Sequence, residues 1–392
     1  MKLSLPGLGT GLLLMRSPIC SLLRSPICSL LRSLTCSLMC SMLLSSCGGG
    51  GGSAGAPGVP AEPTALSASV LAVLVAEGDA TGEANAAAYQ QARGVPAANI
   101  VRVPVPTGSD SITPEAFATL KAAVDARVPA ATQALLLTWT RPSRVVPGSG
   151  PCVMSITSAL TLGYDARYCG GCTATGASPY YNSNSHAPWT DLRLRPAMML
   201  GASSLAQAQT LISRGIAADG SLVGGSPIAQ AWLVRTTDGA RSGRFTDFVS
   251  LAATTVAGAR MNYLDNAAGT GSNFVTGQRD VLWYFTGLER VNQVTTNTYL
   301  PGAVADHLTS YAGLLPDGLG QMTVLEWLQA GLTGSYGTVT EPCAYVEKFP
   351  RASVMVTRYQ RGDTLIEAYW KSVQWPGEGL FVGEPLARPF AR

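Results

Sequence analysis

The sequence is poor in charged residues and in histidine. Only 13% of its 392 residues are charged, about half of the roughly 25% usual in soluble domains, and there are only two histidines. The net charge is +3, but four basic residues and no acid lie within residues 1–46, so the remainder carries −1. No basic run follows, and this disfavours nucleic-acid binding.

Several motifs that identify enzymes are also missing. Beyond residue 66, the chain has no Gly-x-Ser-x-Gly elbow, no phosphate-binding loop, no dinucleotide fingerprint after its first apolar strand and no His-Glu-x-x-His. Beyond residue 46, no stretch approaches the roughly 20 apolar residues that span a bilayer. The sequence therefore predicts no cofactor and no particular enzyme class.

Residues 1–46 have the layout of a signal peptide, with basic residues, an apolar stretch to Leu44 and small residues after it. The end of this segment, Leu44-Ser45-Ser46-Cys47, resembles the bacterial lipoprotein signal. That resemblance implies that Cys47 is lipidated and becomes the mature N-terminus, and two or more acyl chains suffice for stable anchoring. Residues 47–66 then form a flexible Gly/Pro/Ala linker. We expect a membrane-anchored protein of the bacterial cell envelope, with a simple cleaved signal as the alternative.

Four cysteines lie beyond the leader and the lipidation position. In an oxidising envelope compartment, such an even set favours two disulfides, whose pairing the sequence leaves open. A zinc site with three sulfurs and the nitrogen of His186 is one alternative. A redox pair in Cys169-Gly170-Gly171-Cys172 is another, although no helix start is expected there to lower a thiol pKa. The cysteines are Cys152, Cys169, Cys172 and Cys343.

Residues 67–392 alternate apolar runs with helical segments, which predicts a single α/β domain with three αβα layers and a mostly parallel sheet. Helix starts are marked by capping residues, most clearly in Thr113-Pro114-Glu115. Residues 141–195 are rich in Gly, Ser and Pro, and are expected to be an irregular insertion braced by its cysteines. The expected strands are 70–75, 99–105, 134–139, 197–200, 231–236, 281–285, 335–340 and 354–357, and an apolar segment follows at 379–383.

The segment from Asp280 to Cys343 holds the candidates for catalysis. A thiolate nucleophile requires a base that lowers its pKa and a group that orients the base. Cys343, His307 and Asp306 supply these residue types near the expected ends of two strands. In the alternative interpretation, His307 packs at a helix start and Cys343 is disulfide-bonded or buried.

Two resemblances bear on function. Several stretches between residues 65 and 390 resemble an uncharacterised family of secreted bacterial proteins with no assigned activity. They are residues 91–100, 195–200, 302–310, 334–343 and 367–373.

The C-terminal half is also similar to the caspase-like fold of gingipain-type cysteine peptidases. That family has a His-Gly pair after one strand and its nucleophilic cysteine after the next. This sequence has Gly287-Leu288 at the first place and His307–Ser310 at the second, so the usual dyad is missing. We therefore expect a binding or scaffolding protein, with a cysteine hydrolase using Cys343 and His307 as the alternative.

Overall fold

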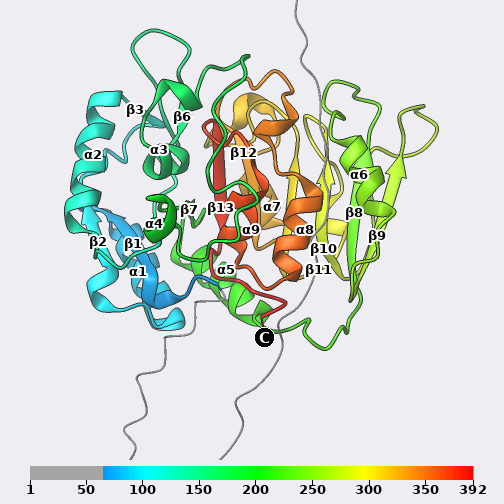
Figure 1. The fold of residues 1–392 in the computed structure, drawn as a ribbon, viewed down its shortest axis with the longest axis horizontal. Helices are drawn as coiled ribbons and strands as arrows, with labels where there is room; N and C mark the ends of the chain where they lie inside the picture. Colours follow the sequence, from blue (N-terminus) through cyan, green and yellow to red (C-terminus); the bar gives the residue numbers. More distant parts are fainter. Residues whose placement is uncertain (1–64, 392) are drawn as a thin grey trace, which may run out of the picture. The chain divides into compact units, whose positions relative to one another are not determined.

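The computed structural model describes residues 65–391, which belong to one compact unit (Figure 1). The expected signal peptide, the lipidation site at Cys47 and nearly all of the linker lie outside the described residues. Among residues 65–391, no helix is both long and apolar enough to cross a membrane.

A ten-stranded sheet runs through the described domain and consists of two parallel halves. The strand order is β2-β1-β4-β7-β13-β12-β11-β10-β8-β9. The only antiparallel pair in this sheet of the described chain is β12 with β13, so the two halves run in opposite directions. Their carboxyl edges therefore lie at opposite edges of the sheet. The first half comprises β1 (Leu71–Ala76), β2 (Ile100–Val103), β4 (Ala134–Leu137), β7 (Ala197–Met199) and β13 (Gly379–Gly383). The second comprises β8 (Ala229–Arg235), β9 (Ala259–Asp265), β10 (Val281–Thr286), β11 (Tyr299–His307) and β12 (Gly334–Thr338).

Helices cover both faces of this sheet, which confirms the three-layer α/β prediction (Figure 1). The first helix packs beside the fifth, the sixth beside the eighth, and the eighth beside the ninth. Strands β1, β4, β7, β10, β12 and β13 are buried along their whole length, whereas β2 and β9, the two ends of the sheet, are partly exposed. The helices are α1 (Ala80–Arg93), α2 (Pro114–Arg127), α3 (Ile156–Leu162), α4 (Pro188–Leu192), α5 (Leu205–Ala218), α6 (Phe245–Ala252), α7 (Val324–Gln329), α8 (Ala352–Gln360) and α9 (Leu365–Ser372).

Local sequence explains the helix boundaries that were predicted. The Asp79 side chain accepts a hydrogen bond from the Thr81 amide at the start of α1, and Gly94 ends that helix in a left-handed conformation. Thr113 caps α2 by accepting from the Ala116 amide, and Pro114 occupies its first turn. These boundaries are confirmed.

Three elements differ from the expectation, and one of them is strand β9, because no strand was expected at residues 259–265. Residues 354–357 were expected to form a strand but lie within α8, where Ala352, Met355, Val356 and Tyr359 are buried at helical spacing. Strand β11 was not predicted, and His307 is its last residue rather than part of a helix start.

The cysteine-bearing insertion connects β4 to β7 and reaches across to the second half of the sheet. Its strand β5 (Arg144–Val145) pairs with β6 (Met154–Ser155) and with β3 (Ser111–Ile112), which lies just before α2, and the three strands form a small second sheet. Disulfides join Cys152 to Cys169 and Cys172 to Cys343, which confirms that the four cysteines form two bridges. The second bridge ties the insertion to the loop after β12.

Candidate functional site

The three catalytic candidates lie at or near the carboxyl edge of the second half-sheet. Asp306 and His307 are the last two residues of β11, and Cys343 follows the neighbouring strand β12. Successive side chains in a strand point to opposite faces, so Asp306 and His307 project into different layers. The contacts of each residue show what it does.

His307 is fully buried and hydrogen-bonded at both ring nitrogens. The Trp327 indole N–H donates to its Nδ1 at 3.0 Å, and its Nε2 lies 3.1 Å from the Met322 carbonyl oxygen. Because Nδ1 accepts, the proton is on Nε2, which donates to Met322. Burial lowers the pKa of His307 to about 3, so the ring is neutral at physiological pH. Both nitrogens are thus occupied by hydrogen bonds, one with Trp327 of α7 and one with Met322 just before α7.

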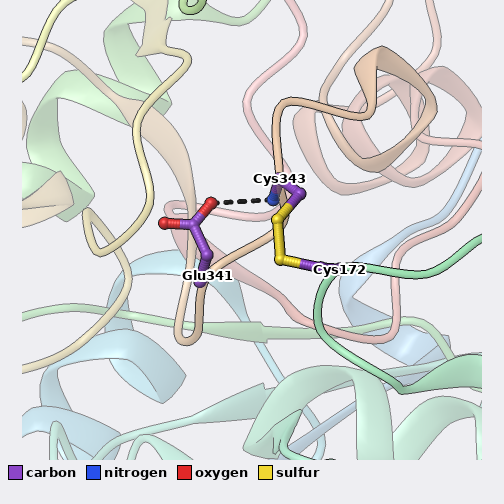
Figure 2. A group of neighbouring side chains, drawn as sticks. All are labelled: Cys172, Glu341 and Cys343. Atoms are coloured by element: carbon purple, nitrogen blue, oxygen red, sulfur yellow. Dashed lines mark hydrogen bonds between the residues drawn. A yellow bond between two sulfur atoms is a disulfide. The ribbon is translucent and has the colours of Figure 1, made fainter.

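Cys343 is bonded to Cys172, and this bond closes its sulfur to nucleophilic chemistry (Figure 2). The Glu341 carboxylate accepts a hydrogen bond from the Cys343 amide at 2.7 Å. Cys172, Glu341 and Cys343 form the single metal-like cluster within the described part of the chain. Zinc binds cysteine as a thiolate, and two sulfurs bonded to each other offer none. The cluster is therefore a disulfide with an adjacent carboxylate that holds the loop.

The alternative zinc set is not assembled in this structure. Cys152, Cys169 and Cys172 are all in disulfides. His186 lies elsewhere, with its Nδ1 2.7 Å from Oε1 of the buried Glu367. The Cys169–Cys172 pair is likewise not joined internally, because each cysteine bonds a different partner.

The positions at which a caspase-like peptidase would carry its dyad have structural roles here. A Cβ atom at Gly287 would lie 1.9 Å from the Arg241 carbonyl oxygen, so this position excludes a histidine side chain. After β11, the buried Thr309 hydroxyl donates to Gln321 Oε1 at 2.8 Å and accepts from Arg241 Nε at 3.1 Å. This network binds the loops together, and residues 307–310 contain no cysteine.

Asp306 is the candidate whose environment is unusual. Its carboxylate is fully buried and lies 2.5 Å from Nη1 of Arg244, itself 4% exposed. Neither carboxylate oxygen has a hydrogen bond of good geometry among residues 65–391. Burial therefore dominates and raises the pKa of Asp306 to about 6, although the positive charge of Arg244 opposes this shift.

Arg244 connects this buried carboxylate to a cleft. Its Nη2 donates to the Thr286 carbonyl at 2.6 Å and its Nη1 to the Pro350 carbonyl at 3.0 Å, while its Nε has no hydrogen-bond partner in the described chain. Leaving a buried donor unpaired costs about 1–3 kcal/mol, so such a group calls for an explanation.

The cleft that Arg244 lines has a volume of about 290 Å³. It lies between the start of α6 and the loop before α8, at the carboxyl edge where α/β folds bind ligands. Asp247 accepts from Arg351 Nε at 3.1 Å and from the Ser353 amide at 3.0 Å, which fixes one wall. The lining side chains include Tyr181, Arg244, Asp247, Glu347, Phe349 and Arg351.

No protein-family model, no curated protein and no solved structure matches this chain.

Proposed function

We propose that this is a lipid-anchored protein of the bacterial cell envelope that binds a small ligand in the cleft between α6 and α8, without covalent catalysis. The observation that carries the proposal is the buried Arg244, which lines the cleft and has an unpaired Nε–H. A ligand oxygen placed there would accept this hydrogen bond and remove the desolvation penalty.

The charges of the cleft favour a zwitterionic ligand. Arg244 and Arg351 contribute guanidinium groups, and Asp247 and Glu347 contribute carboxylates. Tyr181 and Phe349 add aromatic surface, the combination of apolar walls and a few polar groups that ligand sites use. Free amino acids and dipeptides carry the complementary pair of charges and suit a cleft of about 290 Å³.

Binding is favoured over thiol hydrolysis by the fates of the two catalytic candidates. The sulfur of Cys343 is in a disulfide, and His307 is buried with both nitrogens hydrogen-bonded. No base therefore faces a thiolate at this edge of residues 65–391.

Zwitterions should bind to the mature protein more tightly than ions carrying one charge. We expect a panel of free amino acids and dipeptides to include at least one that raises the melting temperature, while acetate and methylammonium do not. Arg351→Gln and Glu347→Gln should each weaken that binding by about 10- to 100-fold, because each removes a charged hydrogen-bonding group. Calorimetric titration measures both effects.

Arg290→Gln is the matched control, because Arg290 forms an exposed ion pair with Glu326 away from the cleft. It should leave the affinity unchanged. The proposed site would be contradicted if no probe binds, or if neither Arg351→Gln nor Glu347→Gln changes the affinity.

The membrane anchor is tested separately at Cys47. Cys47→Ser removes the only sulfur that the lipoprotein-like signal offers for acylation at that position, so the protein should leave the membrane fraction. Fractionation and fatty-acid labelling measure this, with Cys40→Ser as the control because Cys40 lies within the cleaved signal. Retention of a labelled Cys47→Ser protein in membranes would show that the anchor lies elsewhere.

A further inference from the structure

A second cleft lies at the other carboxyl edge of the sheet, beyond the ends of β1, β2, β4 and β7. The strand order of this half places β2 on one side of β1 and β4 on the other. The connection after β1 therefore runs to one side and the connection after β4 to the other. The gap between β1 and β4 is a topological switch point, the place where open α/β sheets bind ligands. The cleft has a volume of about 240 Å³.

Hydroxyl groups dominate the lining of this second cleft. They come from Thr81, Thr107, Thr138, Thr140 and Ser203, which lie after four different strands. Two of the hydroxyls have a defined internal partner: Thr138 donates to the Leu74 carbonyl at 3.0 Å, and Ser203 donates to Gln207 Oε1 at 2.9 Å. Both keep lone pairs that can accept from a ligand.

One buried polar atom of a residue that lines this cleft lacks a partner within residues 65–391, and a second belongs to a residue behind the lining. Trp139 lines the cleft, is 3% exposed, and its indole N–H makes no hydrogen bond. Asn85 is fully buried and donates to the carbonyl of Ala202, which also lines the cleft, but its Oδ1 is unpaired. The unpaired indole N–H of Trp139 calls for a ligand that offers a hydrogen-bond acceptor.

The charged groups of the cleft balance. Asp79 contributes one carboxylate and Arg141 one guanidinium. The Asp79 carboxylate also caps α1, so it occupies the helix end that would otherwise attract an anion. A neutral ligand rich in hydroxyls satisfies the hydroxyls, the carboxylate and the indole N–H without burying an unpaired charge.

We propose that this second cleft binds a neutral polyhydroxylated molecule the size of one sugar ring. The volume lies below the roughly 300–1,000 Å³ of sites for drug-sized ligands, which fits a single ring. The site is independent of the cleft between α6 and α8, because the two lie at opposite edges of the sheet.

The test follows the indole N–H signals of the mature protein by NMR, with Trp139→Phe identifying the Trp139 signal. The probes are glucose, N-acetylglucosamine and myo-inositol. At least one should shift the Trp139 signal in a saturable way and leave that of Trp375 in place. A Thr140→Val/Ser203→Ala variant should bind about 5- to 10-fold or more weakly, because each change removes a hydroxyl.

Ser250→Ala, in the other cleft, is the control and should bind the sugar normally. The proposal is overturned if no polyol moves the Trp139 signal at any soluble concentration. It is also overturned if only an anion such as phosphate or acetate does so, or if the double variant binds the sugar with unchanged affinity.

Discussion

Acidification from about pH 7.5 to about pH 2 is expected to remove about 5 kcal/mol of stability through His307 alone. Burial lowers the pKa of this residue from 6.5 to about 3 in the folded protein. Between these two pKa values, His307 is protonated in the unfolded chain and neutral in the folded protein. Stability contributed by neutral His307 is therefore complete above pH 6.5 and is lost progressively as the pH falls toward 3.

His307→Gln tests this effect, because a glutamine amide can accept from Trp327 and donate to Met322 without titrating. Denaturant unfolding of wild type and variant across the pH range measures the difference. We expect the variant to be less stable than wild type at pH 7, owing to imperfect packing, but to lose about 5 kcal/mol less on acidification. Parallel pH profiles would show that His307 is not a buried neutral histidine.

Protonation of the neighbouring Asp306 should change stability in the opposite direction, so this residue serves as an internal comparison. Burial raises its pKa from 3.8 to about 6, so the folded protein binds the proton before the unfolded chain does. Stability gained in this way amounts to about 3 kcal/mol as the pH falls from about 7 to about 3. In wild type, Asp306 and His307 partly cancel. Asp306→Asn should therefore make the loss of stability on acidification steeper.

Removing the Cys172–Cys343 disulfide should cost about 5 kcal/mol of stability, on the loop-entropy account of cross-links. The two cysteines are 171 residues apart in sequence, so this bridge constrains nearly half of the chain when the protein unfolds. The Cys152–Cys169 bridge spans only 17 residues, and its loss should cost about 3 kcal/mol.

Double serine variants of each pair, unfolded with denaturant, compare the two bridges directly. The larger cost should fall on Cys172→Ser/Cys343→Ser. The loop that follows Cys343 also carries Glu347 and Phe349 into the cleft, so this variant should lose ligand affinity as well. An equal or smaller cost than that of the shorter bridge would contradict the role assigned to the long one.

The sequence predicts the layers of this fold well because its buried strands are continuous apolar runs. Strand β11 escaped prediction because Pro301-Gly302 interrupts its pattern, and proline removes a donor from a sheet. The reversal between the two half-sheets was also out of reach. It depends on the antiparallel pairing of β12 with β13, which runs from Gly334 opposite Gly383 to Thr338 opposite Gly379, and the local sequences of these strands carry no sign of direction.

The sites were harder to predict than the fold. Nothing in the local sequence distinguishes Arg244 from other arginines of the chain. Only its burial against Asp306 identifies it as a candidate ligand-binding residue. The second cleft gathers residues from four separate connections, among them Asp79 and Ser203, and no local motif unites them. The sequence identifies the catalytic candidates Asp306, His307 and Cys343 by residue type alone. Residue type cannot reveal that His307 accepts a hydrogen bond from Trp327 or that Cys343 is bonded to Cys172. The lipid on Cys47 stays a prediction.

We infer that the carboxyl edge of the second half-sheet binds a ligand and carries no reactive cysteine. Alkylation of the folded, unreduced protein near neutral pH, mapped peptide by peptide, tests the absence of a reactive cysteine most directly. We predict no modification at Cys152, Cys169, Cys172 or Cys343, and complete modification of all four after reduction and unfolding. Rapid alkylation of Cys343 in the native protein, slowed by His307→Gln, would contradict the account and establish a reactive cysteine with a histidine base.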